Sequence, residues 1–86
     1  MPEISRFFGI VILMYYREHI PPHFHVRYND QHATVSIDSG KVLDGQLTGR
    51  VQRLVLEWLE IHREEMAENW KRATTRAPLK AISPLE

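Results

Sequence analysis

The sequence predicts an α+β fold: an antiparallel sheet of about four strands followed by one long C-terminal helix packed on one face, then an extended C-terminal tail. In the first half of the chain, apolar and polar residues alternate, which is typical of half-buried strands. From Thr48 to about Thr74, apolar residues recur every three or four positions, which is typical of an amphipathic helix. Turn signals at Asn29-Asp30 and Asp38-Ser39-Gly40 separate the strand patterns. With neither a repeat nor a linker, residues 1–86 are predicted to form a single domain.

The strands are expected in four places. Residues 4–16 are rich in β-branched and aromatic side chains, with Gly9 as a bend or bulge. Residues 23–28 and 33–37 alternate on either side of Asn29-Asp30, and a short strand follows at 41–43. The sequence therefore indicates a hairpin near the middle of the sheet.

The register of that hairpin follows from its alternation. A two-residue loop at Asn29-Asp30 places Val26 opposite Ala33 and Phe24 opposite Val35 on an apolar face. The reverse face then collects polar side chains, namely His23, His25, Arg27, His32, Thr34 and Ser36. The helix is expected on the apolar face, through Val55, Trp58 and Met66.

Two further segments bear on this arrangement. The helix carries Trp58 and Trp70 as core anchors, and His62 falls on its apolar stripe. Residues 10–15 are apolar at every position, so the first strand is expected to be covered on both faces. Its second cover could be the tail (Leu79, Ile82, Leu85), a second copy of the chain, or a different partner.

Composition limits the classes of function. Eleven basic residues balance eleven acidic ones, whereas a protein that mainly grips nucleic-acid backbone is usually strongly basic. The chain has no cysteine, which excludes disulfides and thiolate chemistry. Its apolar run at 10–16 is too short to cross a bilayer, and no signal-peptide pattern is present. We therefore expect a cytoplasmic protein without membrane contact.

The segment His-Ile-Pro-Pro-His-Phe-His, residues 19–25, carries the chemistry of the chain. His23 and His25 are two apart in a strand and so share a face, which Arg27 continues. One hypothesis is metal-independent acid–base chemistry on RNA, in which the two histidines move protons and Arg27 stabilises the phosphate. These three residues are the candidate catalytic set, and the candidate binding residues around them are His19, His32, Thr34 and Ser36.

Metal binding by the same histidines is a further alternative. His23 and His25 are close enough to share an ion that His19, His32 or Asp44 could complete. A His-x-His pair without further spaced ligands is a weak signal, so no metal ligand and no cofactor is assigned.

Several motifs along the chain resemble a known family. They are the opening Met-Pro-Glu-Ile-Ser-Arg-Phe-Phe-Gly-Ile-Val-Ile, the Pro-Pro-His-Phe-His corner, Leu-Glu-Trp-Leu-Glu-Ile-His-Arg-Glu-Glu followed by Asn-Trp, and the Pro-Leu-Lys and Ile-Ser-Pro-Leu of the tail. Together they resemble the small bacterial family known as domain of unknown function 4160. The polar and aromatic positions that match its hallmarks are His19, His23, His25, Trp58, His62, Arg63, Asn69 and Trp70. Thr48 stands where the family usually has proline before the helix.

The resemblance implies no established activity. Members are often encoded beside another small family, domain of unknown function 2442, in an arrangement that resembles a toxin–antitoxin pair. We therefore expect an interaction or regulatory domain that binds a small protein partner encoded nearby, or a second copy of itself, through the polar sheet face. RNA is a possible alternative partner.

Overall fold

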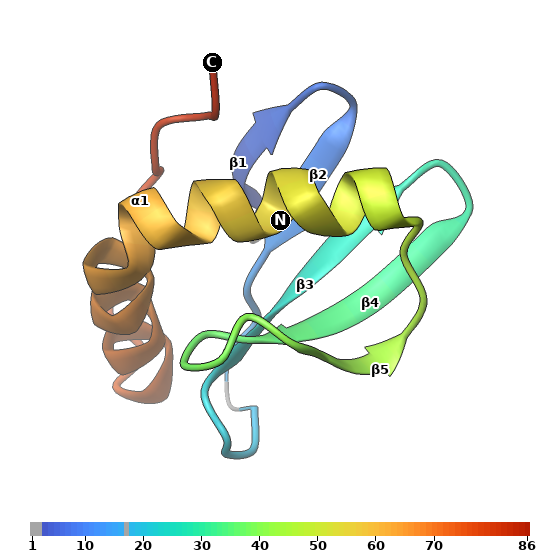
Figure 1. The fold of residues 1–86 in the computed structure, drawn as a ribbon. Coiled ribbons are helices and arrows are strands. Elements are labelled where there is room, and N and C mark those ends of the chain that lie inside the picture. The colour runs from blue at the N-terminus through green and yellow to red at the C-terminus, as the bar shows by residue number, and fades with distance from the viewer. Residues whose placement is uncertain (1–2, 17) are drawn as a thin grey trace.

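The computed structural model describes residues 3–16 and 18–86 and contains five strands and one helix (Figure 1). In chain order these are β1 (Glu3–Phe7), β2 (Ile10–Leu13), β3 (His23–Tyr28), β4 (Gln31–Ser36), β5 (Val42–Gly45) and α1 (Gly49–Thr74). The strands form one antiparallel sheet in the order β1-β2-β3-β4-β5. The α+β fold with a single long C-terminal helix is thus confirmed, with five strands in place of about four.

The additional strand comes from a hairpin inside the segment expected to be one strand. Phe8 and Gly9 have φ angles of 52° and 79°, and Phe7 pairs directly with Ile10. Positive φ at both central residues matches the right-handed twist of the flanking strands. Gly9 is therefore a residue of the tight turn, where the sequence had indicated a bend or bulge within one strand.

The central hairpin has the predicted register. Val26 pairs with Ala33 and Phe24 with Val35, and Tyr28 and Gln31 flank the two-residue loop. On the other face, Arg27 pairs with His32, His25 with Thr34, and His23 with Ser36. Both faces of this hairpin therefore have the predicted composition.

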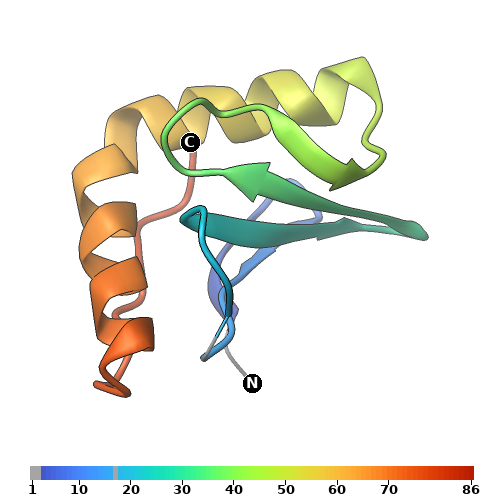
Figure 2. The same cartoon turned by 90° about the horizontal axis from the view of Figure 1, so that it is seen from below.

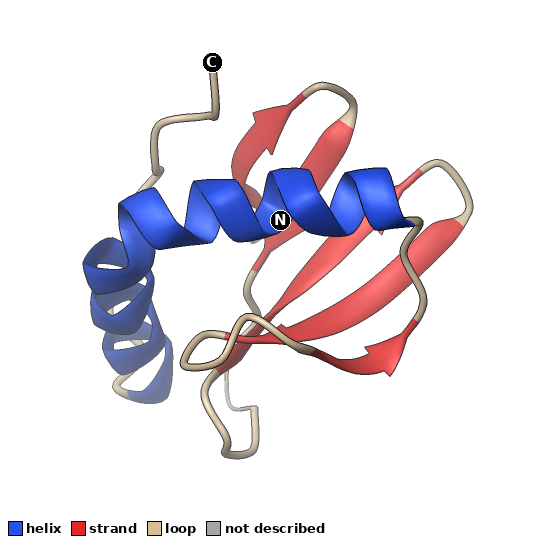
Figure 3. Cartoon of the chain, in the orientation of Figure 1, coloured by secondary structure: helices blue, strands red, loops and turns tan. Residues whose placement is uncertain are grey.

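Helix α1 begins as predicted but bends. Thr48 occupies the N-cap position with extended backbone, although its side chain makes no capping hydrogen bond. At His62 the backbone leaves the helical region, with φ −115° and ψ 21°. Figures 1 and 2 show the first half of α1 lying across one face of the sheet and the second half turning down beside it. α1 is thus a single helix by secondary structure (Figure 3) but forms two helical arms in space.

The core lies between the sheet and both arms of α1. Trp58 is fully buried and contacts Phe24 edge-on, with ring centroids 6.0 Å apart. Val55 and Met66 are buried with it, as predicted. No helix in the described part of the chain combines the length and the apolar character that crossing a bilayer requires.

The C-terminal tail joins this same core. The Ile82 amide donates to the Ile4 carbonyl at 2.8 Å, and Trp58 Nε1 donates to the Ser83 carbonyl at 2.9 Å. Ile82 and Leu85 are buried in the cluster on the helix side of the sheet. The tail was one of the possible covers for the second face of the sheet. It packs on the helix side and therefore does not cover the polar face.

Candidate functional site

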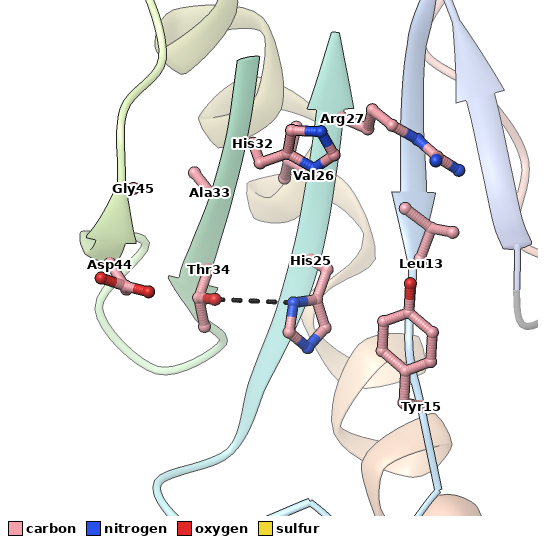
Figure 4. Close-up of a pocket in the computed structure, with 10 residues that line it drawn as sticks. All are labelled: Leu13, Tyr15, His25, Val26, Arg27, His32, Ala33, Thr34, Asp44 and Gly45. Atoms are coloured by element: carbon pink, nitrogen blue, oxygen red, sulfur yellow. Dashed lines mark hydrogen bonds between the residues drawn. The ribbon is translucent and has the colours of Figure 1, made fainter. Parts of the chain in front are cut away.

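The sheet face turned away from the first arm of α1 is hollowed and carries most of the predicted site residues. We call it the histidine face and define it by His25, Arg27, His32 and Thr34. These four line a cavity of about 330 Å³ (Figure 4). The others that line it are Leu13, Tyr15, Val26, Ala33, Asp44 and Gly45.

His23 and Ser36 share the register of this face but are covered. His23 is 8% exposed, and its ring lies 5.2 Å from that of Trp70 on the second arm of α1. Ser36 is also buried, and its hydroxyl accepts a hydrogen bond from the Ser39 amide at 3.1 Å. The bend at His62 carries Trp70 to this end of the sheet, so the open polar row is shorter than the sequence predicted.

One further residue at this end was not predicted from the sequence. Glu18 lies in the loop between β2 and β3 and is half-buried, and its Oε1 contacts both histidines of the His-x-His pair. That oxygen is 3.4 Å from His23 Nε2 and hydrogen-bonds to His25 Nε2. The Glu18 carboxylate is therefore shared between two imidazoles.

Each imidazole is also held at its other nitrogen. His23 Nδ1 lies 2.7 Å from the Pro21 carbonyl oxygen, which only accepts, so Nδ1 carries the proton and donates. His25 Nδ1 faces the Thr34 hydroxyl at 3.5 Å across the strand pair (Figure 4). Both Nε2 atoms are consequently the ones turned toward Glu18.

Aromatic rings enclose this cluster. The His23 and His25 rings meet edge-on at 5.3 Å, and Tyr15 packs against His25 at 4.8 Å. With Trp70 on the far side of His23, the two imidazoles lie between a tyrosine and a tryptophan. Trp70 covers His23, whereas the side chains of His25 and Glu18 stay about a quarter exposed.

The remaining candidate ligands do not join the cluster. Among the described residues, Glu18, His23 and His25 form the group whose ligand atoms lie within 4.8 Å of one another. His19 is exposed in the loop, while His32 and Asp44 line the hollow. The carboxylate comes from Glu18, which spacing within the strand pattern could not reveal because the loop between β2 and β3 must fold back to bring it there.

The edge strand β1 carries an ion pair between Glu3 and Arg6. Arg6 donates to both carboxylate oxygens of Glu3 at 2.9 and 3.0 Å. This hydrogen bonding, the charge of Arg6 and, last, the charge of Arg27 lower the pKa of Glu3.

Asp44 reaches the hollow because of a close backbone approach at Gly45. A Cβ added there would lie 2.2 Å from the His32 carbonyl oxygen, and Gly45 has φ +82°. Only glycine permits this conformation without strain. As a result β5 pairs with β4 so that Asp44 stands opposite Thr34.

Comparison with known proteins places the sequence of this chain in a family. The profile of the family described as "Domain of unknown function (DUF4160)" matches residues 9–71 of the chain. The chain belongs to the DUF4160 family. No curated protein and no solved structure gives a significant match.

The DUF4160 match confirms the resemblance seen in the motifs. It covers the whole of β2 to β5 and most of α1, and so includes Glu18, His23, His25 and Trp70. Strand β1 and the tail, which pair with each other through Ile4 and Ile82, lie outside it. The histidine cluster and its tryptophan cover therefore fall within the part of this chain that the family describes.

Proposed function

We propose that this DUF4160 domain is an interaction module that binds a small protein partner through the histidine face. In this proposal it works in the bacterial cytosol as one component of a toxin–antitoxin-like pair of neighbouring genes. The observation that carries it is the contrast between the two faces of the sheet. The helix and the tail pack on one, whereas the other is hollowed and open.

The side chains around the hollow are of the kind that protein interfaces use. Tyr15 lines the hollow and is 40% exposed, and the Arg27 side chain extends from β3 toward β2 (Figure 4). Tyrosine and arginine are enriched at binding hot spots because they combine large contact area with a polar end. Asp44 on the opposite side adds an acceptor, which favours a partner with paired charges over a purely apolar one.

The test is co-purification with the product of the adjacent gene. Arg27→Glu and Asp44→Lys are each expected to weaken the complex by at least about tenfold, because each reverses one charge at the interface. Arg53→Glu makes the same charge change on the exposed side of α1 and is expected to leave the complex intact. A complex that tolerates both face variants but is lost with Arg53→Glu would overturn the proposal.

A second candidate function is cleavage of RNA. The contact between Glu18 and His25 supports it. A carboxylate on one imidazole nitrogen orients that ring for proton transfer. In this mechanism the ribose 2′-hydroxyl attacks phosphorus and gives its proton to one histidine. The 5′-oxygen leaves with a proton from His23, which requires Trp70 to move off that ring, because His23 is 8% exposed in this structure. Arg27 stabilises the charge on the phosphate.

Growth of a bacterial host separates the two functions. Induction of the chain alone is expected to arrest growth if it cleaves RNA, and His25→Ala with Arg27→Ala is expected to relieve the arrest. His32→Ala is the matched control, because His32 lies on the same face outside the Glu18 cluster. Unaffected growth with the native chain would exclude the toxin function and leave the interaction module.

A further inference from the structure

We propose that Glu18, His23 and His25 bind one divalent transition-metal ion of the Zn²⁺ class. This inference does not rest on the proposed function, because the ion would be held whether or not a partner occupies the hollow. Two imidazoles and one carboxylate are an established ligand set for zinc and for related first-row metals. Imidazole ligands also disfavour Mg²⁺ and Ca²⁺, which prefer oxygen.

The ligand atoms already converge. In a tetrahedral site with bonds of 2.0–2.1 Å, neighbouring ligand atoms lie roughly 3.3 Å apart. His23 Nε2 and Glu18 Oε1 are 3.4 Å apart. Glu18 and His25 are in direct hydrogen-bond contact, and Glu18 belongs to a loop, so a small outward shift of its carboxylate admits the ion.

The outer contacts of the two histidines are those of metal ligands. A ligating histidine usually donates its other ring N–H to a carbonyl or another oxygen, which fixes the tautomer. The Pro21 carbonyl does this for His23 at Nδ1, and Nε2 is the nitrogen directed at Glu18. The Thr34 hydroxyl stands in the corresponding position for His25.

The surroundings favour a held ion over a loosely bound one. His23 is buried under Trp70, and the Tyr15 ring packs edge-on against His25. Three protein ligands leave one position for water or a ligand, as in catalytic rather than structural zinc sites. His25 also lines the hollow of the histidine face, so the two sites share this side chain.

A simple alternative is that Glu18 only bridges the two imidazoles by hydrogen bonds. The two arrangements differ in whether the cluster binds added Zn²⁺. The test uses the full chain without a histidine tag, after a chelator has removed any metal. Zn²⁺ is titrated in competition with a chromophoric chelator. We expect one ion per chain, and a rise in melting temperature of about 15 °C when Zn²⁺ exceeds its Kd a hundredfold.

Variants connect the binding to these side chains. Glu18→Gln and His25→Gln are each expected to weaken Zn²⁺ binding by more than about 100-fold, beyond the effect typical of an outer contact. His32→Gln and His19→Gln remove histidines outside the cluster and are expected to leave affinity unchanged. Because His23 is buried, Glu18→Gln carries the test if His23→Gln fails to fold.

Co²⁺ gives a second readout that is independent of affinity. The visible absorption of bound Co²⁺ is expected to have the intensity of a four- or five-coordinate site in the native chain and to be lost in His25→Gln. Equal affinity for Zn²⁺ in the native chain, Glu18→Gln and His25→Gln would overturn the proposal. So would a native chain that binds no Zn²⁺, or one whose melting temperature Mg²⁺ raises as much as Zn²⁺ does.

Discussion

Trp58 joins the sheet, the helix and the tail. Its ring is fully buried, stacks on Phe7 with centroids 5.7 Å apart, and meets Phe24 edge-on. Its indole N–H donates to the Ser83 carbonyl of the tail. Because this one side chain supplies both apolar area and a hydrogen bond to the tail, its replacement removes both contributions together.

We expect Trp58→Phe to lower the free energy of unfolding by about 1–3 kcal/mol, since it leaves the Ser83 carbonyl without its donor and removes volume. Trp58→Ala is expected to cost about 3–5 kcal/mol. Ile61→Ala, at a helix position that is 63% exposed, is the control and should stay within about 0.5 kcal/mol. Urea denaturation measures all three, and a Trp58→Phe variant as stable as the control would contradict the role of the indole N–H.

Alanine substitutions at two glycines are expected to change the free energy of unfolding in opposite directions. Gly45→Ala places a Cβ 2.2 Å from the His32 carbonyl oxygen at φ +82°, and should lower the free energy of unfolding by about 1–3 kcal/mol. Gly49→Ala, at the first residue of α1, meets no atom within 4 Å and should raise it by about 0.4–1 kcal/mol. If thermal denaturation shows both variants changing stability in the same direction, the close approach at Gly45 is not what restricts that position.

The Glu3–Arg6 pair gives a pH dependence. Hydrogen bonding to Arg6 lowers the pKa of Glu3, so this pair adds stability above the unfolded-state pKa of the carboxyl and loses it as pH falls through the folded-state pKa. NMR titration should find the Glu3 pKa higher in Arg6→Gln than in the native chain. Arg27→Gln should raise it less, because the Arg27 charge is the smallest of the contributions. An equal rise in both variants would contradict this order.

At the scale of elements, the central hairpin was predictable in full and the first hairpin was not. Between β3 and β4, a slip of one residue would bury polar groups, so alternation alone determines the register. Between β1 and β2, apolar residues run through the turn at Phe8-Gly9, and no change of pattern marks the reversal. One glycine in such a run is compatible with either a bulge or a turn.

Neither the bend in α1 nor the position of Glu18 could be predicted from the sequence. Residues 50–74 contain neither proline nor glycine, so the periodic pattern continues through His62 without a signal for a kink. Glu18 is followed by the Pro21-Pro22 corner, and its approach to His23 depends on the path of that loop. Both features arise from tertiary packing, and together they determine which histidines are covered and which carboxylate meets them.

The second arm of α1 is held to the tail by Asn69. This side chain is 1% exposed, donates from Nδ2 to the Lys80 carbonyl, and accepts from the Lys80 amide at Oδ1, each at 2.9 Å. Asn69→Asp removes the donor and buries a charge, so we expect the free energy of unfolding to fall by about 2–3 kcal/mol. Trypsin should also cleave after Lys80 faster than in the native chain.

Glu57→Gln is the control for Asn69→Asp, because Glu57 is exposed on the first arm of α1. It should change neither the unfolding curve nor the rate of cleavage at Lys80. A tail that resists trypsin equally in Asn69→Asp and in the native chain would show that Trp58 and Ile82 hold it without help from Asn69.

At the scale of the whole molecule, the tail completes the core on one face and leaves the other available for binding. A domain of 86 residues has a stability of roughly 5–10 kcal/mol, and burying Ile82 and Leu85 contributes about 1.5–3 kcal/mol each. The tail also accepts from Trp58 and donates to Ile4. Its contribution is therefore comparable with the total stability of the domain.

Removal of residues 79–86 is accordingly expected to lower the free energy of unfolding by about 4–6 kcal/mol and leave a marginally stable chain. Removal of Glu86 alone, which is exposed, should have no measurable effect. Because Glu18, His23 and His25 lie outside the tail, saturating Zn²⁺ should restore about 2.7 kcal/mol at a hundredfold excess over Kd. A truncated chain as stable as the native one would mean that the sheet and α1 form a sufficient core without the tail. If the truncated chain is destabilised and Zn²⁺ does not raise its free energy of unfolding, Glu18 only bridges the two histidines by hydrogen bonds.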